Sequence, residues 1–133
     1  MKDKKEPILL ANWIMCPNGT MIPSMHRHDY KEYVNEDGSY SSVDGGLDYL
    51  RRGGKYTEMS VYSDDPFEVI RRFVCRGGRG KEGKEPLTYV PLFRMSDEWL
   101  KATIEYIEND NIYKEYYEKE LEYRKENNVT IKE

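Results

Sequence analysis

The chain has 133 residues, a formal net charge of −4 and a mean hydropathy of −0.91. This length favours one compact domain with a core of ordinary size, and an aromatic share of 13% argues against a wholly disordered chain. The apolar run at residues 8–16 is too short to cross a bilayer, and residues 1–7 lack the shape of a signal peptide. We therefore expect a soluble protein of the cytoplasm.

The charges are distributed unevenly along the chain. Lys and Arg number 10 against 6 Asp and Glu in residues 49–94, whereas the counts are 5 against 8 in residues 1–48 and 6 against 11 in residues 95–133. Seven of the ten central cations are arginines, which suit planar, bidentate contacts with phosphate. The overall acidity disfavours stable binding of duplex nucleic acid, but the central third could hold a local anion site.

The first half of the chain predicts short strands joined by turns, over residues 8–15, 29–34, 39–46 and 56–62. Asp37-Gly38 is a strong hairpin signal, so the strands on either side of it are expected to pair antiparallel. Alternation along the second strand places Tyr30 and Val34 on one face and Tyr33 on the other.

The second half predicts helices over residues 64–74, 96–110 and 111–128, with Ser96 as an N-cap. A glycine-rich basic loop is expected between the first two helices, at residues 75–86. The predicted class is α+β: a small antiparallel sheet in an N-terminal part, about residues 8–63, packs against about three helices in a C-terminal part, about residues 65–128. Together they form a single domain, 1–133.

The chain's two histidines, His26 and His28, bracket Arg27 and precede Asp29. On a strand, the two imidazoles would share one face. In one interpretation, one histidine is a surface residue and the other forms a local hydrogen bond. Another makes them donors, with Arg27, to an anionic ligand, while Asp29 orients them or accepts from a sugar or base. A nuclease that uses both histidines with Asp29 and Asp44 as metal ligands is a further alternative.

The two cysteines offer a third role for the histidines, as zinc ligands. Cys16 and Cys75 could complete a tetrahedral site with His26 and His28, but neither cysteine has a partner two residues away. We therefore expect two reduced thiols, no metal and no cofactor.

A second motif runs from Asp44 through two glycines and Tyr49 to Arg51 and Arg52. One interpretation is a hairpin turn followed by a solvated arginine pair. The other is a nest of glycine amides for an anion, with a tyrosine stacking face and an arginine fork. Neither a Walker lysine nor a Gly-x-Gly-x-x-Gly fingerprint is present.

The basic loop repeats this chemistry, with Arg76, Arg79, Lys81 and Lys84 among glycines. It could be a solvated flexible loop or a mobile lid over an anionic ligand. Catalysis has little support, because no serine elbow is present and the cysteines lack a neighbouring base.

The strings SMHRHDY, SVDGGLDYLRRGG and the segment 64–106 resemble a family of small proteins encoded by tailed bacteriophages, over about residues 13–128. Many relatives carry a zinc-ribbon-like set of four cysteines, of which only Cys16 remains here. The resemblance brings no established activity. It implies an accessory protein of an infected bacterium, of a kind that counters host defence by occluding a defence protein or by sequestering a nucleotide signal.

The leading hypothesis is a non-enzymatic binder that sequesters an anionic nucleotide, such as a cyclic nucleotide immune signal. A homodimer is expected, because small pockets of this kind are often built between subunits. The alternative is an inhibitor whose acidic helices and exposed tyrosines bind a host defence protein directly. The expected ligand-binding residues are His26, Arg27, His28, Asp29, Asp44, Gly45, Gly46, Tyr49, Arg51 and Arg52, with Arg76 and Arg79 as the lid.

Overall fold

The computed structural model describes residues 6–80 and 82–132, so the first residues of the chain and Lys81 of the basic loop lie outside the description. The class is α+β, as predicted, with antiparallel strands in the N-terminal half and helices in the C-terminal half. The chain divides into two compact units, Met1–Ile70 (unit 1) and Arg71–Glu133 (unit 2). The boundary falls within helix α1, Phe67–Phe73. Whether the two units form one domain stays a prediction.

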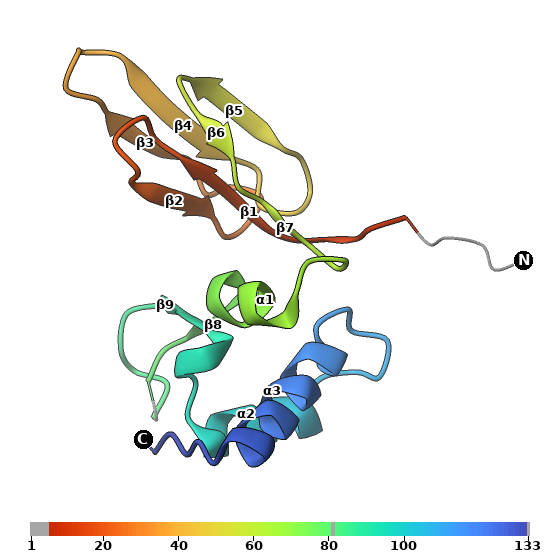
Figure 1. The fold of residues 1–133 in the computed structure, drawn as a ribbon. Coiled ribbons are helices and arrows are strands. Elements are labelled where there is room, and N and C mark those ends of the chain that lie inside the picture. The colour runs from red at the N-terminus through yellow and green to blue at the C-terminus, as the bar shows by residue number, and fades with distance from the viewer. Residues whose placement is uncertain (1–5, 81, 133) are drawn as a thin grey trace, which may run out of the picture. The chain divides into compact units, whose positions relative to one another are not determined.

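Unit 1 consists of antiparallel strands in two sheets (Figure 1). In the first sheet, β1 pairs with β2, β6 and β7, and in the second the order is β3-β4-β5. The strands are β1 Leu9–Met15, β2 Met21–Ser24, β3 Lys31–Val34, β4 Tyr40–Asp44, β5 Arg51–Gly54, β6 Thr57–Glu58 and β7 Val61–Tyr62.

The hairpin predicted at Asp37-Gly38 is confirmed. Val34 of β3 pairs with Tyr40 of β4, and Gly38 takes the positive φ of 86° that favours glycine. The strand predicted over 56–62 is instead interrupted between β6 and β7. The Ser60 hydroxyl replaces a backbone partner there by accepting from the Trp13 amide at 3.2 Å. Strands β2 and β5 were not predicted.

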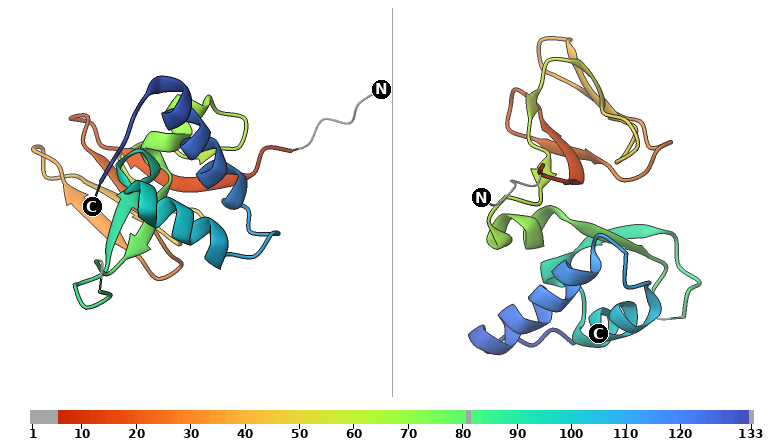
Figure 2. Two further views of the ribbon diagram at one scale, coloured as in Figure 1. Left: turned by 90° about the horizontal axis from the view of Figure 1, so that it is seen from below. Right: turned by 90° about the vertical axis from the view of Figure 1, so that its right-hand side faces the viewer.

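After the last turn of α1, unit 2 forms a β hairpin and continues as two helices that pack on each other. Figure 2 shows the hairpin and the helices from two further sides. The elements are β8 Cys75–Gly78, β9 Thr88–Pro91, the 3-10 turn η1 Leu92–Arg94, α2 Asp97–Tyr106 and α3 Lys114–Asn127. The predicted basic loop is therefore shorter than expected, because its first four residues pair with β9. Ser96 caps α2 as predicted, and its hydroxyl accepts from the Trp99 amide at 3.1 Å.

A buried ion network organises unit 2 around Glu120, whose side chain is fully buried. Arg71 donates to both of its carboxylate oxygens at 2.8 Å, and Arg124 donates to Oε2 at 2.8 Å. Arg124 also donates to Asp97 Oδ1 at 2.6 Å and to the Leu92 carbonyl at 2.9 Å. Each guanidinium therefore has oxygen partners that offset part of the cost of its burial.

The C-terminal segment is tied to the same network. Beyond α3, the Ile131 carbonyl accepts from the Asp97 amide at 2.8 Å. This contact holds the segment against the first turn of α2. Among the residues described, no helix is long and apolar enough to span a bilayer.

Candidate functional site

The His-Arg-His-Asp motif forms a turn between β2 and β3, not a strand. The Asp29 amide donates to the His26 carbonyl at 2.9 Å, which closes the turn. The strand alternation that would put the two imidazoles on one face therefore does not apply. His26, Arg27 and His28 are exposed. The His26 Nδ1 accepts from the His28 amide at 3.2 Å, so the neutral ring carries its proton on Nε2 and is a donor there.

Asp29 holds this turn in shape. Its Oδ2 accepts from the Met25 amide at 2.7 Å and from Lys31 Nζ at 2.6 Å. Partial burial acts to raise the pKa of Asp29, but these hydrogen bonds and the Lys31 charge outweigh it and lower the pKa below its ordinary value. The carboxylate thus binds the backbone and a lysine, and these hydrogen bonds fix the turn instead of orienting the imidazoles.

The paired glycines do not form an open nest of amides. The Gly45 amide donates to Asp44 Oδ1 at 2.8 Å, and the Gly46 amide donates to Ser24 Oγ at 2.9 Å. A Cβ added to Gly46 would lie 2.6 Å from the His26 carbonyl carbon, and Gly46 has a φ of 54°. The glycine is needed so that the two motifs can approach each other.

The two sequence motifs therefore meet in space, within unit 1. The Tyr49 hydroxyl donates to the Arg27 carbonyl at 2.6 Å, and the Arg51 guanidinium lies 4.5 Å from the centre of the Tyr49 ring. Arg27 Nε lies 3.9 Å from Asp48 Oδ2, with both side chains largely exposed. We call His26, Arg27, His28, Tyr49 and Arg51 the turn cluster.

Arg52 does not belong to the turn cluster. It follows Arg51 on β5 and points to the opposite face, where 8% of its side chain is exposed. Its guanidinium donates to Asn12 Oδ1 at 3.0 Å and to Ser60 Oγ at 2.6 Å. Arg52 therefore supports the interior of unit 1, and its prediction as a ligand contact has no geometric support.

The two arginines predicted as a lid also separate. Arg76 lies on β8, and its guanidinium is 5.8 Å from the centre of the Tyr117 ring of α3. Arg79 follows β8 and lines a cavity of about 820 Å³ in unit 2. The cavity is within the size range of sites for small ligands. Its lining residues are Gly78, Arg79, Gly80, Thr88, Val90, Arg94, Ser96, Glu98, Trp99, Ala102 and Lys132.

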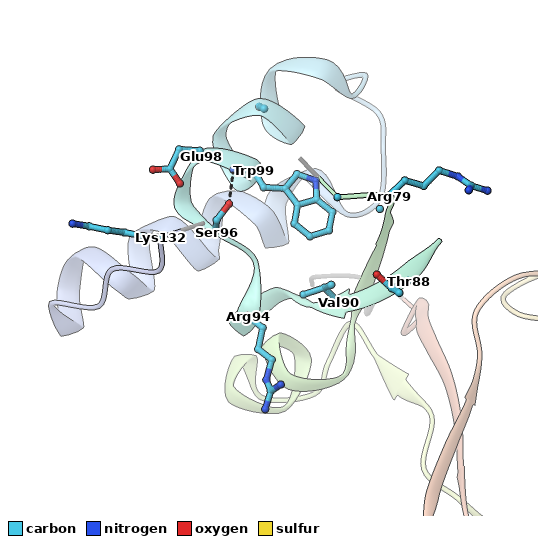
Figure 3. A pocket seen from close by; sticks show the side chains of 11 residues that line it. Arg79, Thr88, Val90, Arg94, Ser96, Glu98, Trp99 and Lys132 are labelled. Carbon is cyan, nitrogen blue, oxygen red and sulfur yellow. Dashed lines mark hydrogen bonds between the residues drawn. The ribbon is translucent and has the colours of Figure 1, made fainter. Parts of the chain in front are cut away.

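The chemistry of the cavity combines an aromatic ring with cations. Figure 3 shows the Trp99 ring between the α2 ribbon and the β8–β9 hairpin, with the three cationic side chains extending outward in different directions. The Ser96 cap fixes the first turn of α2, which carries Trp99. A Cβ added to Gly78 would lie 2.8 Å from Trp99 Cζ2, so the ring packs directly on the strand backbone.

Sequence reasoning missed Trp99, Arg94 and Lys132. One signal was present: Trp99 precedes Leu100, the first member of the buried row of α2, and so falls beside that row. A large aromatic residue beside the buried row indicates a second contact surface. The contribution of Lys132 could not be foreseen, because it depends on the fold of the C-terminal segment.

In residues 6–80 and 82–132, no set of side chains is arranged as the zinc or the nuclease alternative would require. No group of three or more His, Cys, Asp and Glu side chains there could hold a metal ion. Cys16 is buried in unit 1, whereas Cys75 belongs to unit 2. Burial raises the pKa of the Cys75 thiol to about 11, so this thiol is protonated at neutral pH.

The inhibitor alternative requires exposed tyrosines on the acidic helices, but most tyrosines of α3 are at least partly covered. Tyr116 and Tyr117 of α3 are buried, and Tyr113 is half-buried, so these side chains do not offer an exposed tyrosine face. Burial raises the pKa of Tyr117 in spite of the nearby Arg76 guanidinium. Tyr106 of α2, in contrast, is exposed.

Comparisons with known proteins add no relative to this geometry. No family model, no curated protein and no solved structure matches the chain. The resemblance to phage proteins therefore stays a prediction. The contacts described above have to carry the functional proposal alone.

Proposed function

We propose that the chain binds a small anionic nucleotide in the unit 2 cavity and holds it without chemical change. One observation carries this proposal: a cavity of about 820 Å³ is lined by Trp99 and by three cationic residues, Arg79, Arg94 and Lys132. A nucleotide has a flat base, which can stack on the tryptophan, and a charged phosphate, which can bind the cationic side chains. The proposal keeps the predicted ligand class and moves the site from the turn cluster to unit 2.

Each group in the cavity matches one part of such a ligand. Trp99 offers a flat surface for a base, and stacking of this kind contributes about 1–3 kcal/mol per base. The three cationic side chains extend outward (Figure 3), and on binding they would turn toward a phosphate, to which the two arginines can donate in a bidentate manner. Glu98 would repel a phosphate next to it, so we place a sugar hydroxyl or a base N–H there, which a carboxylate accepts.

The lining favours binding over catalysis. It contains neither histidine nor cysteine, and Glu98 is its single acidic side chain. The Ser96 hydroxyl already accepts from the Trp99 amide as the cap of α2. A nucleophile paired with a general base, the arrangement that covalent catalysis requires, is not present among these eleven residues. In an infected bacterium, such a binder would act by stoichiometric depletion of a nucleotide signal.

The test is calorimetric titration of the chain with cyclic dinucleotides, cyclic trinucleotides and ADP-ribose. We expect one of these to bind with a stoichiometry near one per chain. The Trp99→Ala and Arg79→Ala variants should each weaken binding about tenfold or more, because each removes an interaction worth about 1–3 kcal/mol. Chromatography of the recovered ligand should show it unchanged. Gel filtration tests the expected homodimer.

Arg51→Ala is the matched control, since Arg51 is an exposed arginine of unit 1. It should bind the same ligand as tightly as the parent chain. If Arg51→Ala abolished binding while Trp99→Ala did not, the site would be the turn cluster and the assignment to unit 2 would be wrong. No heat with any member of the panel, or a chemically altered ligand, would contradict the proposed function itself.

A further inference from the structure

The sheet β3-β4-β5 of unit 1 presents an outer face that the nucleotide proposal does not use. Antiparallel register places Val34 opposite Tyr40 and Glu32 opposite Ser42 on β3 and β4. On β4 and β5 it places Ser42 opposite Gly53 and Asp44 opposite Arg51. Directly paired residues share a face, so these positions belong to one surface. The alternate positions face inward, as the fully buried Val43 and the Arg52 side chain, which is 8% exposed, show.

Gly53 of β5 makes part of this face flat. A Cβ added to Gly53 would lie 2.8 Å from Ser42 Oγ and 3.3 Å from Tyr40 Cε2, whereas one added to Gly54 would collide with the Tyr40 carbonyl oxygen. The Tyr40 ring therefore lies beside a residue that has no side chain to lift it from the sheet. Tyr40 remains 46% exposed in this position. The Tyr40 ring thus gives a reason for Gly53, and the close approach of the Tyr40 backbone gives a reason for Gly54.

Two further aromatic rings border the same face. Tyr30 precedes β3, is 56% exposed and donates from its hydroxyl to Glu32 Oε1 at 2.6 Å. Tyr49 is held by its hydrogen bond to the Arg27 carbonyl and by the Arg51 guanidinium over its ring. The rings are fixed by the protein itself. A ligand that stacks on them would lose little entropy in ordering them.

The charges of this face distinguish between kinds of nucleic acid. Arg51 and Arg27 lie at the end of the sheet where the turn cluster is, and His26 adds a ring N–H donor. Glu32 and Asp44 lie on the sheet itself. A duplex would bring rows of phosphates against these carboxylates. A single strand can turn its bases toward the tyrosines and leave a few phosphates at the arginines.

We propose that this face binds single-stranded nucleic acid, with bases stacked on Tyr30 and Tyr40 and phosphates at Arg51 and Arg27. The site lies entirely in unit 1. It is independent of the cavity in unit 2, and its ligand is a polymer instead of a small nucleotide.

Fluorescence anisotropy of a labelled ten-nucleotide single strand, in DNA and RNA forms, tests this site at low salt. The parent chain should bind, and an unlabelled duplex of the same sequence should compete poorly. The double variant Tyr30→Ala, Tyr40→Ala should weaken binding at least tenfold, since stacking on each ring is lost. The double variant Tyr30→Phe, Tyr40→Phe keeps both rings and should bind within about threefold of the parent.

Tyr106→Ala is the matched control, because Tyr106 is a tyrosine of α2 that is 82% exposed. It should not change binding. The double variant Arg27→Ala, Arg51→Ala should flatten the dependence of affinity on salt by about 0.7 for each phosphate that is no longer neutralised. Trp99→Ala should leave strand binding unchanged while it weakens nucleotide binding, so the two proposals can fail separately.

Three outcomes would overturn the inference. One is the absence of any anisotropy change with single strands. Another is a loss of strand binding in Trp99→Ala but not in the tyrosine-to-alanine variant, which would place the strand in the cavity. The third is self-association of the parent chain that the tyrosine-to-alanine variant abolishes, with no strand binding, which would make the face an interface between copies.

Discussion

Each unit of this protein contains one pair of consecutive arginines, and in both pairs only one of the two side chains is exposed to solvent. In unit 1 the Arg52 side chain is 8% exposed while Arg51 is exposed, and in unit 2 Arg71 is buried while Arg72 is exposed. The partners of the buried members differ. Arg52 donates to neutral Asn12 and Ser60, with Glu58 Oε1 3.7 Å away. Arg71 instead forms a bidentate ion pair with a fully buried carboxylate.

The comparison shows why arginine content alone overstates the capacity of a chain to bind anions. A buried guanidinium needs oxygen partners to offset its loss of hydration, and those partners occupy the donors that a phosphate would need. Strand alternation and helical rotation both separate neighbouring residues, so one member of each pair is committed to the interior. Only the exposed members are open to a ligand.

The largest effect is expected where the buried charges depend on each other. Glu120→Gln should destabilise unit 2 by about 3–5 kcal/mol, because Arg71 loses its countercharge inside the protein. Urea unfolding followed by circular dichroism at 222 nm measures this, since α2 and α3 are in unit 2. Glu118→Gln, at an exposed position of the same helix, should change stability by less than about 0.5 kcal/mol. Equal losses of stability in Glu120→Gln and Glu118→Gln would show that the buried ion network does not stabilise unit 2 more than an exposed carboxylate does.

A smaller effect is expected in unit 1, where the partners are neutral. Arg52→Ala should cost about 1–3 kcal/mol, because the buried Asn12 Oδ1 loses its donors. Arg51→Ala should cost less than about 0.5 kcal/mol. Urea unfolding followed by Trp13 fluorescence, in a Trp99→Phe background, reports on unit 1. A larger loss for Arg51→Ala than for Arg52→Ala would reverse the assignment of the two roles.

The smallest effect concerns the turn and depends on pH. The pKa of Asp29 is lowered in the folded chain, so its contribution is present above the unfolded value of 3.8 and is lost as pH falls below it. Asp29→Asn should therefore reduce stability by no more than about 1 kcal/mol at pH 7 and should have less effect at pH 3. Unfolding curves at the two pH values test this. A difference between the two proteins that grew on acidification would contradict the account.

Local signals in the sequence predicted much of the fold. The Asp37-Gly38 hairpin and the Ser96 cap depend on nearby residues, and both were found. The segments 51–54 and 75–78 were misread because each contains two glycines, which have low strand propensity. Their pairing partners also lie across an intervening loop. The cavity was missed because its lining residues come from a hairpin, a helix and the C-terminal segment, which are separated in the sequence.

The attachment of the C-terminal segment to α2 has a practical consequence for anyone who works with this protein. The Ile131 carbonyl accepts a hydrogen bond from the Asp97 amide, and the next residue, Lys132, lines the unit 2 cavity. A purification tag fused after Lys132 would therefore place foreign atoms next to the cavity and could by itself alter the binding measurements proposed above.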